Sequence, residues 1–160
     1  MCGPWYPSAM TSPSEDLASH FNASNDGWNT AMGLRFVHAT ADEVVAEWDV
    51  GPPHRQIHGI VHGGVHAGVI ETVASIGAGL SAGARGQTVV GLENHTSFIR
   101  AVREGTLRAV ARPLTRGRRT QVWEATVTDA EGRIAATGRV RLLCLDEGTV
   151  LAGEAAARKR

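Results

Sequence analysis

Two groups that could act together on a carbonyl compound lie in one stretch, from Arg55 to Gly83, which reads RQIHGIVHGGVHAGVIETVASIGAGLSAG. His62 is followed by two glycines, and Glu71 is the one carboxylate in the apolar segment after them. At a helix start the backbone N–H groups are unpaired and the dipole is positive, and glycine lets a ligand come close. A carboxylate can attack a carbonyl carbon or deprotonate water. The stretch therefore offers an anion-stabilising end and a nucleophile or base.

A single long helix is predicted from Gly64 to Ala82 to position these groups. The segment is apolar nearly all round, so most of its sides should be buried. Glu71 and Ser75 are four residues apart and share one face. The many glycines and alanines weaken the intrinsic helicity, so the helix must be held by the structure that surrounds it.

The distance between the two groups predicts a symmetric dimer. From Gly63 to Glu71 a helix rises roughly 12 Å. A reacting carbonyl must lie about 3 Å from both the attacking group and the oxyanion donor. Two helices that run antiparallel across a two-fold axis would bring the start of one beside Glu71 of the other. This arrangement gives two composite sites.

Other interpretations of the same residues stay open. Glu71 could face solvent or pair with an arginine such as Arg100. Four histidines at a spacing of four also invite a metal site, but prolines and glycines interrupt any continuous helix through them: His54, His58, His62 and His66. No H-E-x-x-H zinc motif occurs. Gly79–Gly83 reads GLSAG and matches G-x-S-x-G, but its serine falls inside the predicted helix and not on the strand-to-helix turn that a serine nucleophile requires. We therefore expect no metal and no serine nucleophile.

The rest of the chain alternates with a period of two and predicts strands. A hairpin with its turn at Ala41-Asp42 precedes the helix, and four strands joined as antiparallel neighbours by short turns follow it. A single helix can cover so many strands only if the sheet curls round it. The predicted strands are 34–40, 43–50, 88–102, 105–114, 119–129 and 133–145. The predicted organisation is an N-terminal tail with short helices (1–30), one α+β domain (31–146) and a flexible C-terminal tail (147–160).

Composition narrows the function classes. Sixteen basic residues balance sixteen acidic ones, so nothing global indicates a nucleic-acid partner. Cys2 and Cys144 have no metal-ligand spacing and are interpreted as free thiols in a reducing compartment, the cytoplasm. The N-terminus lacks the pattern of a signal peptide, and Glu71 and several glycines interrupt the longest apolar run, so no membrane span is expected.

The motif HGGVHAGVIETVAS resembles that of the hotdog-fold acyl-CoA thioesterases, in particular the PaaI-like group that includes one class of 4-hydroxybenzoyl-CoA thioesterases. The resemblance covers about Leu34 to Leu145. It implies a hotdog fold, a curled antiparallel sheet of about six strands around one central helix. It also implies hydrolysis of an acyl-CoA or aroyl-CoA thioester without a cofactor, by a homodimer at minimum and commonly a homotetramer.

The resemblance also implies roles for individual residues. The catalytic set would be Glu71 as nucleophile or general base, the Gly63 N–H as the donor to the thioester carbonyl, Gln56 to position the thioester, His62 to support the loop, and Ser75 to orient water or the carboxylate. The coenzyme A phosphates would be held by Arg100, Arg118, Arg119 and Thr120. Arginine suits phosphate because its fork donates two hydrogen bonds, although a basic turn can also be merely solvated.

Two competing functions use the same fold. A non-catalytic acyl-CoA-binding module is the main alternative, but a pure binder gains nothing from an acid at Glu71. A hotdog dehydratase is disfavoured, because HGGVHAGVIE lacks the aspartate and histidine signature of that class.

Overall fold

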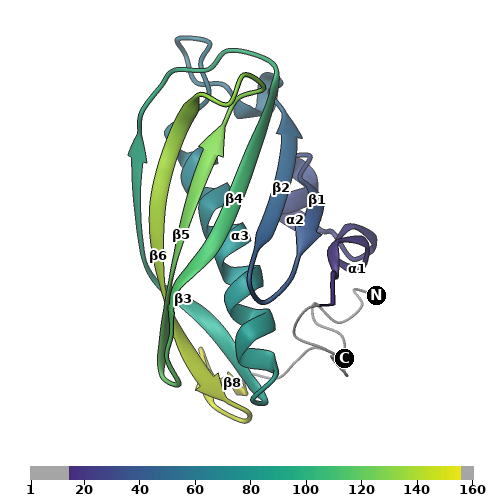
Figure 1. Ribbon diagram of the computed structural model, residues 1–160, viewed down its shortest axis with the longest axis vertical. Coiled ribbons are helices and arrows are strands. Elements are labelled where there is room, and N and C mark those ends of the chain that lie inside the picture. Colours follow the sequence, from purple (N-terminus) through teal and green to yellow (C-terminus); the bar gives the residue numbers. More distant parts are fainter. Residues whose placement is uncertain (1–14, 156–160) are drawn as a thin grey trace.

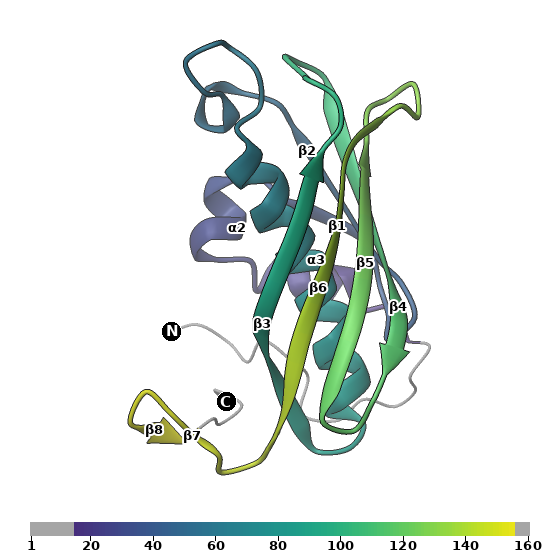
Figure 2. The ribbon, with the colours of Figure 1, turned by 90° about the vertical axis from the view of Figure 1, so that its left-hand side faces the viewer.

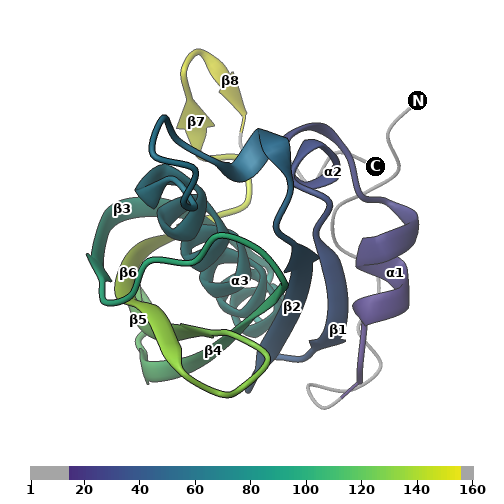
Figure 3. The same ribbon diagram turned by 90° about the horizontal axis from the view of Figure 1, so that it is seen from above.

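Helix α3, Gly63–Gly83, runs along the inside of a curled six-stranded antiparallel sheet (Figures 1 and 3). This arrangement confirms the hotdog fold predicted from the sequence, and the helix extends one residue beyond each predicted end. The computed structural model describes residues 15–155. The elements are α1 (Ala18–Ala23), α2 (Gly27–Ala31), β1 (Arg35–Ala39), β2 (Val44–Asp49), η1 (Pro52–His54), α3, β3 (Gln87–Phe98), β4 (Thr106–Arg116), β5 (Thr120–Thr128), β6 (Ile134–Asp146), β7 (Val150–Leu151) and β8 (Glu154–Ala155).

Close packing and one buried amide hold α3 against the sheet. A Cβ atom at Gly77 would collide with the ring of Trp123, so glycine lets the indole touch the helix backbone. The Gln121 side chain is fully buried and donates to the carbonyl of Ala78 over 3.0 Å, and it accepts from the indole N–H of Trp123 over 3.0 Å. Although α3 is long and apolar enough to cross a membrane, most of it is buried, as expected of a soluble core helix.

The strand order β1-β2-β4-β5-β6-β3 corrects one prediction. The sequence suggested that β3 and β4 were neighbours, but β3 pairs with β6 at the edge of the sheet. The connection between β3 and β4 is tied down along its length. Ile99 and Arg100 donate their N–H groups to Ala135 of β6, and Val102 accepts from the N–H of Val61. These bonds hold the connection beside the start of α3. Residues 103–105 therefore lie just before β4 and do not form a hairpin turn between β3 and β4.

The ends of the chain add small elements. Asp26 is the N-cap residue of α2, and its side chain accepts from the N–H of Gly27. Strands β7 and β8 form a short hairpin within the segment predicted as a flexible C-terminal tail. Cys144 is buried and free. The predicted N-terminal tail up to residue 14, with Cys2, and residues 156–160 lie outside the described residues.

Strand β3 is an edge strand with exposed apolar side chains. Its register with β6 shifts between Gly91 and Glu93, which marks a bulge at Leu92. Leu92 is 50% exposed, and Phe98 at the strand's end is 61% exposed. A long edge with exposed apolar groups is a surface that proteins normally cover.

Candidate active site

The start of α3 is a capped helix end with one available backbone donor. His62 is the N-cap residue, and its Nδ1 accepts a hydrogen bond from the N–H of Gly64 over 2.8 Å. Within residues 15–155, no acceptor binds the N–H of Gly63, which is one of the groups a helix start leaves unpaired. A Cβ at Gly63 would lie 2.6 Å from Cζ of Phe98, so the absence of a side chain lets this ring close over the backbone.

A pocket of about 440 Å³ opens at this helix end. It brings together four residues predicted to function, namely Gln56, His62, Gly63 and Arg100. The side-chain oxygen of Gln56 accepts from the N–H of His58 over 2.7 Å, which fixes the amide in the loop before α3. The remaining lining residues are mostly apolar and are Ile60, Val61, Gly64, His66, Phe98, Ile99 and Ala101.

Glu71 lies on the exposed face of α3 and is not part of this pocket. Its Oε2 accepts from Nδ2 of Asn94 on β3 over 3.3 Å, and the same Nδ2 donates to the carbonyl of Ala67 over 2.9 Å. A Cβ at Gly91 would lie 2.6 Å from the Glu71 Oε1, so a glycine beside the β3 bulge makes room for the carboxylate. The partner of Glu71 is thus an amide on the neighbouring strand, and the suggested ion pair with Arg100 does not form.

A single chain therefore separates the predicted catalytic residues into two groups. Gln56, His62 and Gly63 lie around the pocket, whereas Glu71 and the half-buried Ser75 lie two and three turns further along α3.

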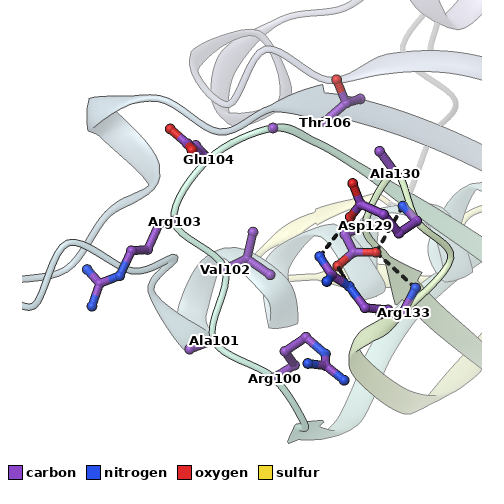
Figure 4. Close-up of a pocket in the computed structure, with 11 residues that line it drawn as sticks. Arg100, Ala101, Val102, Arg103, Glu104, Thr106, Asp129, Ala130 and Arg133 are labelled. Carbon is purple, nitrogen blue, oxygen red and sulfur yellow. Dashed lines mark hydrogen bonds and ion pairs between the residues drawn. The ribbon is translucent and has the colours of Figure 1, made fainter.

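The predicted coenzyme A ligands also separate. Arg100 borders the first pocket and a second one of about 650 Å³ beside it (Figure 4). In the second pocket Arg133 is bound to Asp129 over 2.7 Å, and Arg103 points away and donates to the carbonyl of His58 (Figure 4). Arg118, Arg119 and Thr120 are exposed at the β4–β5 turn, at the opposite end of the molecule from the start of α3 (Figure 1).

Three residues of the site were missed by sequence reasoning: Gly91, Asn94 and His66. A glycine inside a strand is a signal of a bulge or a close approach, so Gly91 could have been noticed. Asn94 carries no such signal. His66 is only 3% exposed and forms part of the first pocket, its Nδ1 has no hydrogen-bond partner within residues 15–155, and its ring packs against Trp48 and Phe98.

The burial of His66 predicts a specific loss of stability in acid. Burial lowers the pKa of this ring from 6.5 to about 4. Below pH 6.5 the unfolded chain binds a proton that the folded protein does not, so stability falls as the pH drops from about 6.5 to about 4. His66→Leu should remove this loss. The free energy of unfolding of both proteins is measured in urea at pH 7.5 and pH 4.5. Between these pH values, the difference between His66→Leu and wild type should shift by about 2 kcal/mol in favour of the variant.

The control for this experiment is His95→Leu, which changes an exposed histidine on β3. If the difference in free energy of unfolding between His66→Leu and wild type were the same at both pH values, His66 would take up its proton equally in the folded and unfolded states.

No group of three or more His, Cys, Asp or Glu side chains within residues 15–155 is arranged to hold a metal ion. What the described residues offer is an N–H donor, a carboxylate and an apolar pocket.

Comparison with known proteins gives a consistent picture. The sequence model of the thioesterase superfamily matches residues 58–136. The Mycobacterium tuberculosis protein Rv1847 is 39% identical over 136 residues, which is 84% of this chain and 96% of that protein. Its structure covers 74% of this chain and 96% of its own with a TM-score of 0.73 at 40% identity.

Two further relatives have named activities. The Escherichia coli 1,4-dihydroxy-2-naphthoyl-CoA hydrolase is 43% identical over 54 residues, which is 34% of this chain and 40% of that protein. The structure of a mutant of the Pseudomonas aeruginosa thioesterase PA1618 has a TM-score of 0.76 at 26% identity, and the match covers 80% of this chain and 93% of that one.

Proposed function

Because this chain belongs to the hotdog-fold thioesterase superfamily and is a thioester hydrolase, we propose that it hydrolyses acyl-CoA or aroyl-CoA at sites shared between two subunits. One observation supports this proposal above the others. A single helix carries an unbonded N–H at Gly63 over a pocket, and a carboxylate at Glu71 eight residues further on. The products are the free acid and coenzyme A.

The two groups perform complementary parts of the reaction. The Gly63 N–H donates to the thioester oxygen and stabilises the negative charge that develops there, and losing one such donor typically costs about 2.7–4 kcal/mol of barrier. Glu71 either attacks the carbonyl carbon and forms an anhydride that water cleaves, or takes the proton of an attacking water. In both routes the sulfur leaves with the bonding electrons. His62 holds the loop by accepting from Gly64, Gln56 positions the thioester, and Ser75 orients water or the carboxylate.

The distance along α3 is the reason for two subunits. If the β3 edges of two chains pair antiparallel, their α3 helices lie side by side in opposite directions. Ala67 is the midpoint between Gly63 and Glu71, so a two-fold axis near Ala67 places each Gly63 beside the Glu71 of the other chain. The pairing also covers the exposed apolar groups of β3. We propose this dimer as the functional unit and a homotetramer as the assembly. The cytoplasm is the proposed location, because a reducing compartment keeps Cys144 a thiol.

The same pairing gives the basic turn a role. In the dimer, the β4–β5 turn of the partner lies at the end where the pocket of the first chain opens. Across the paired edges, β3 of the first chain is three strand spacings, about 14 Å, from β5 of the partner. We propose that Arg118, Arg119 and Thr120 hold coenzyme A phosphates there, and that Arg100 contacts the part of the ligand nearer the thioester.

The variant Arg118→Ala/Arg119→Ala tests this assignment. Because the phosphates are remote from the reacting atoms, their binding is largely the same in ground and transition states. The KM for acyl-CoA should rise about tenfold or more, with kcat nearly unchanged. The comparison substrate is an acyl thioester that lacks the nucleotide, and the control variant is Arg139→Ala, an exposed arginine on β6. An equal effect on both substrates would show that these arginines do not contact the nucleotide.

The direct test of the proposed function is a panel of acyl-CoAs with short, long and aromatic acyl groups, followed by release of free thiol. Turnover of at least one member supports the proposal. Tight binding of the whole panel without any release of thiol would instead identify a non-catalytic acyl-CoA-binding module.

A further inference from the structure

Helix α3 lies between two different walls (Figures 2 and 3), and Glu71 is on its exposed face. On one side is β3, where Asn94 bonds to Ala67 and Glu71. On the other side is α2, where Asn29 accepts from the hydroxyl of Thr72 over 3.4 Å. The floor between them has small side chains, because Ala67 and Gly68 are the residues one turn before Glu71.

Trp28 of α2 forms part of the second wall. A Cβ at Gly68 would lie 2.6 Å from Cη2 and Cζ2 of Trp28, so the edge of the indole rests directly on the helix backbone. The ring is nevertheless 42% exposed. Gly68 and Glu71 are three residues apart, so side chains at these positions lie about 5–6 Å from one another. The indole therefore borders the space beside the Glu71 carboxylate.

The backbone around Trp28 is held in place by polar contacts. Asp26 accepts from the N–H of Gly27 over 2.6 Å, and the Asn25 side chain donates to the carbonyl of Leu34 over 2.9 Å. The carbonyl of Asn29 accepts from the N–H of Leu34 over 3.0 Å. The backbone that carries the indole is thus anchored, and the ring rests on α3 while much of its surface remains open. An indole has only two rotatable side-chain bonds, so it loses little entropy when it binds another apolar group.

We propose that Trp28 is a specificity-determining residue that forms the wall of the acyl-group site beside Glu71, and that it favours bulky apolar acyl groups over acetyl. This inference rests on the proposed thioesterase function. A carbonyl carbon within reach of Glu71 has two directions open along this face. The β3 side presents the amide of Asn94, whereas the α2 side presents the indole of Trp28. Directly beside the Glu71 carboxylate, the large ring that a bulky apolar acyl group can contact lies on the α2 side, and an acetyl group has little surface to place against it.

The first test compares Trp28→Ala and Trp28→Phe with wild type on benzoyl-CoA, hexanoyl-CoA and acetyl-CoA. For Trp28→Ala, kcat/KM should fall roughly 10- to 100-fold with benzoyl-CoA and less than about threefold with acetyl-CoA. Trp28→Phe should recover most of the loss. The control is Val37→Ala, which removes a similarly exposed apolar side chain on β1. An equal loss on all three substrates, or no loss on any, would overturn the inference.

A second variant displaces the ring without removing it. Gly68→Ala places a methyl group 2.6 Å from two ring atoms, so the indole must move, whereas alanine favours the helix. The ratio of benzoyl-CoA to acetyl-CoA turnover should change in this variant even though its thermal stability does not fall. A loss of the dimer in Trp28→Ala, measured by light scattering, would show that the indole is a subunit contact and would overturn the inference.

A binding measurement separates this inference from the proposed function. In Glu71→Gln, which keeps the shape of the site, the Kd for benzoyl-CoA and acetyl-CoA is measured by calorimetry with and without Trp28→Ala. The ratio of the two Kd values should change at least about fivefold. If wild type releases no thiol from any substrate, the proposed function fails, and this ratio still decides whether Trp28 recognises the acyl group.

Discussion

Glu71→Gln should lower kcat for acyl-CoA hydrolysis by about a thousandfold, since general acid–base groups typically contribute 10²–10⁴-fold. Glutamine has the size of glutamate, so it fits the space that Gly91 leaves, and its side-chain oxygen can still accept from Asn94. It can neither attack as a carboxylate nor take a proton from water. The folded structure and the KM should therefore stay close to those of the wild type. Stopped-flow measurement of thiol release gives kcat and KM, and a thermal melt shows whether the variant is as stably folded as the wild type.

The matched control is Glu93→Gln, which removes a carboxylate two residues beyond Gly91 on the same edge strand. Glu93 is ion-paired with Arg141 over 3.1 Å and lies outside the proposed site. Its kcat should remain within about twofold of wild type, as is usual for an exposed pair. Turnover of Glu71→Gln near the level of Glu93→Gln would exclude Glu71 from the chemistry.

Two inactive variants should restore activity when they are combined. In Glu71→Ala the carboxylate is missing, and in Gly63→Pro the donor N–H is missing. A mixed dimer has one site with both defects and one site with neither. Random pairing makes half of the dimers mixed, so co-expression should give about a quarter of the wild-type activity.

Gly63→Ala is the control for the donor variant. Alanine and proline both bring atoms against the ring of Phe98, but only proline lacks the N–H. The activity of Gly63→Ala should therefore exceed that of Gly63→Pro, because the exposed Phe98 ring can move aside. If every subunit held a complete site, no mixture of Glu71→Ala and Gly63→Pro could be active. A fully active monomer would exclude the shared site in a different way.

Most of the fold could be predicted because its signals are local. The apolar run between Gly64 and Ala82 has the length of a helix, and the alternating segments after it have the period of strands. The neighbours of β3 could not be predicted in this way. They depend on the bonds that tie the 99–105 connection to Ala135 and Val61, residues that are distant in the sequence.

The candidate site also contains residues that a local motif places and residues that only distant contacts place. The histidine, the glycines and the acid form a continuous motif, so their positions follow from the helix. Trp28 and Asn94 come to the same face from α2 and β3, and no spacing in the sequence connects them to Glu71. His66 lay inside the motif, but its neighbours suggested only a helix interior, and its role as part of the pocket depends on contacts with Phe98.

The contact of Trp123 with Gly77 has a consequence for how finely this enzyme can be tuned. The Trp123 indole against Gly77 and the hydrogen bond from Gln121 to Ala78 fix the position of α3 along its axis relative to its own sheet. In a two-fold dimer the two helices point in opposite directions, so any displacement of α3 along its axis is doubled between Gly63 of one subunit and Glu71 of the other. A slide of one residue would change that spacing by about 3 Å, as much as the whole reach of the attacking oxygen. In the proposed dimer, substitutions in the core far from the substrate would thus act on the rate through symmetry.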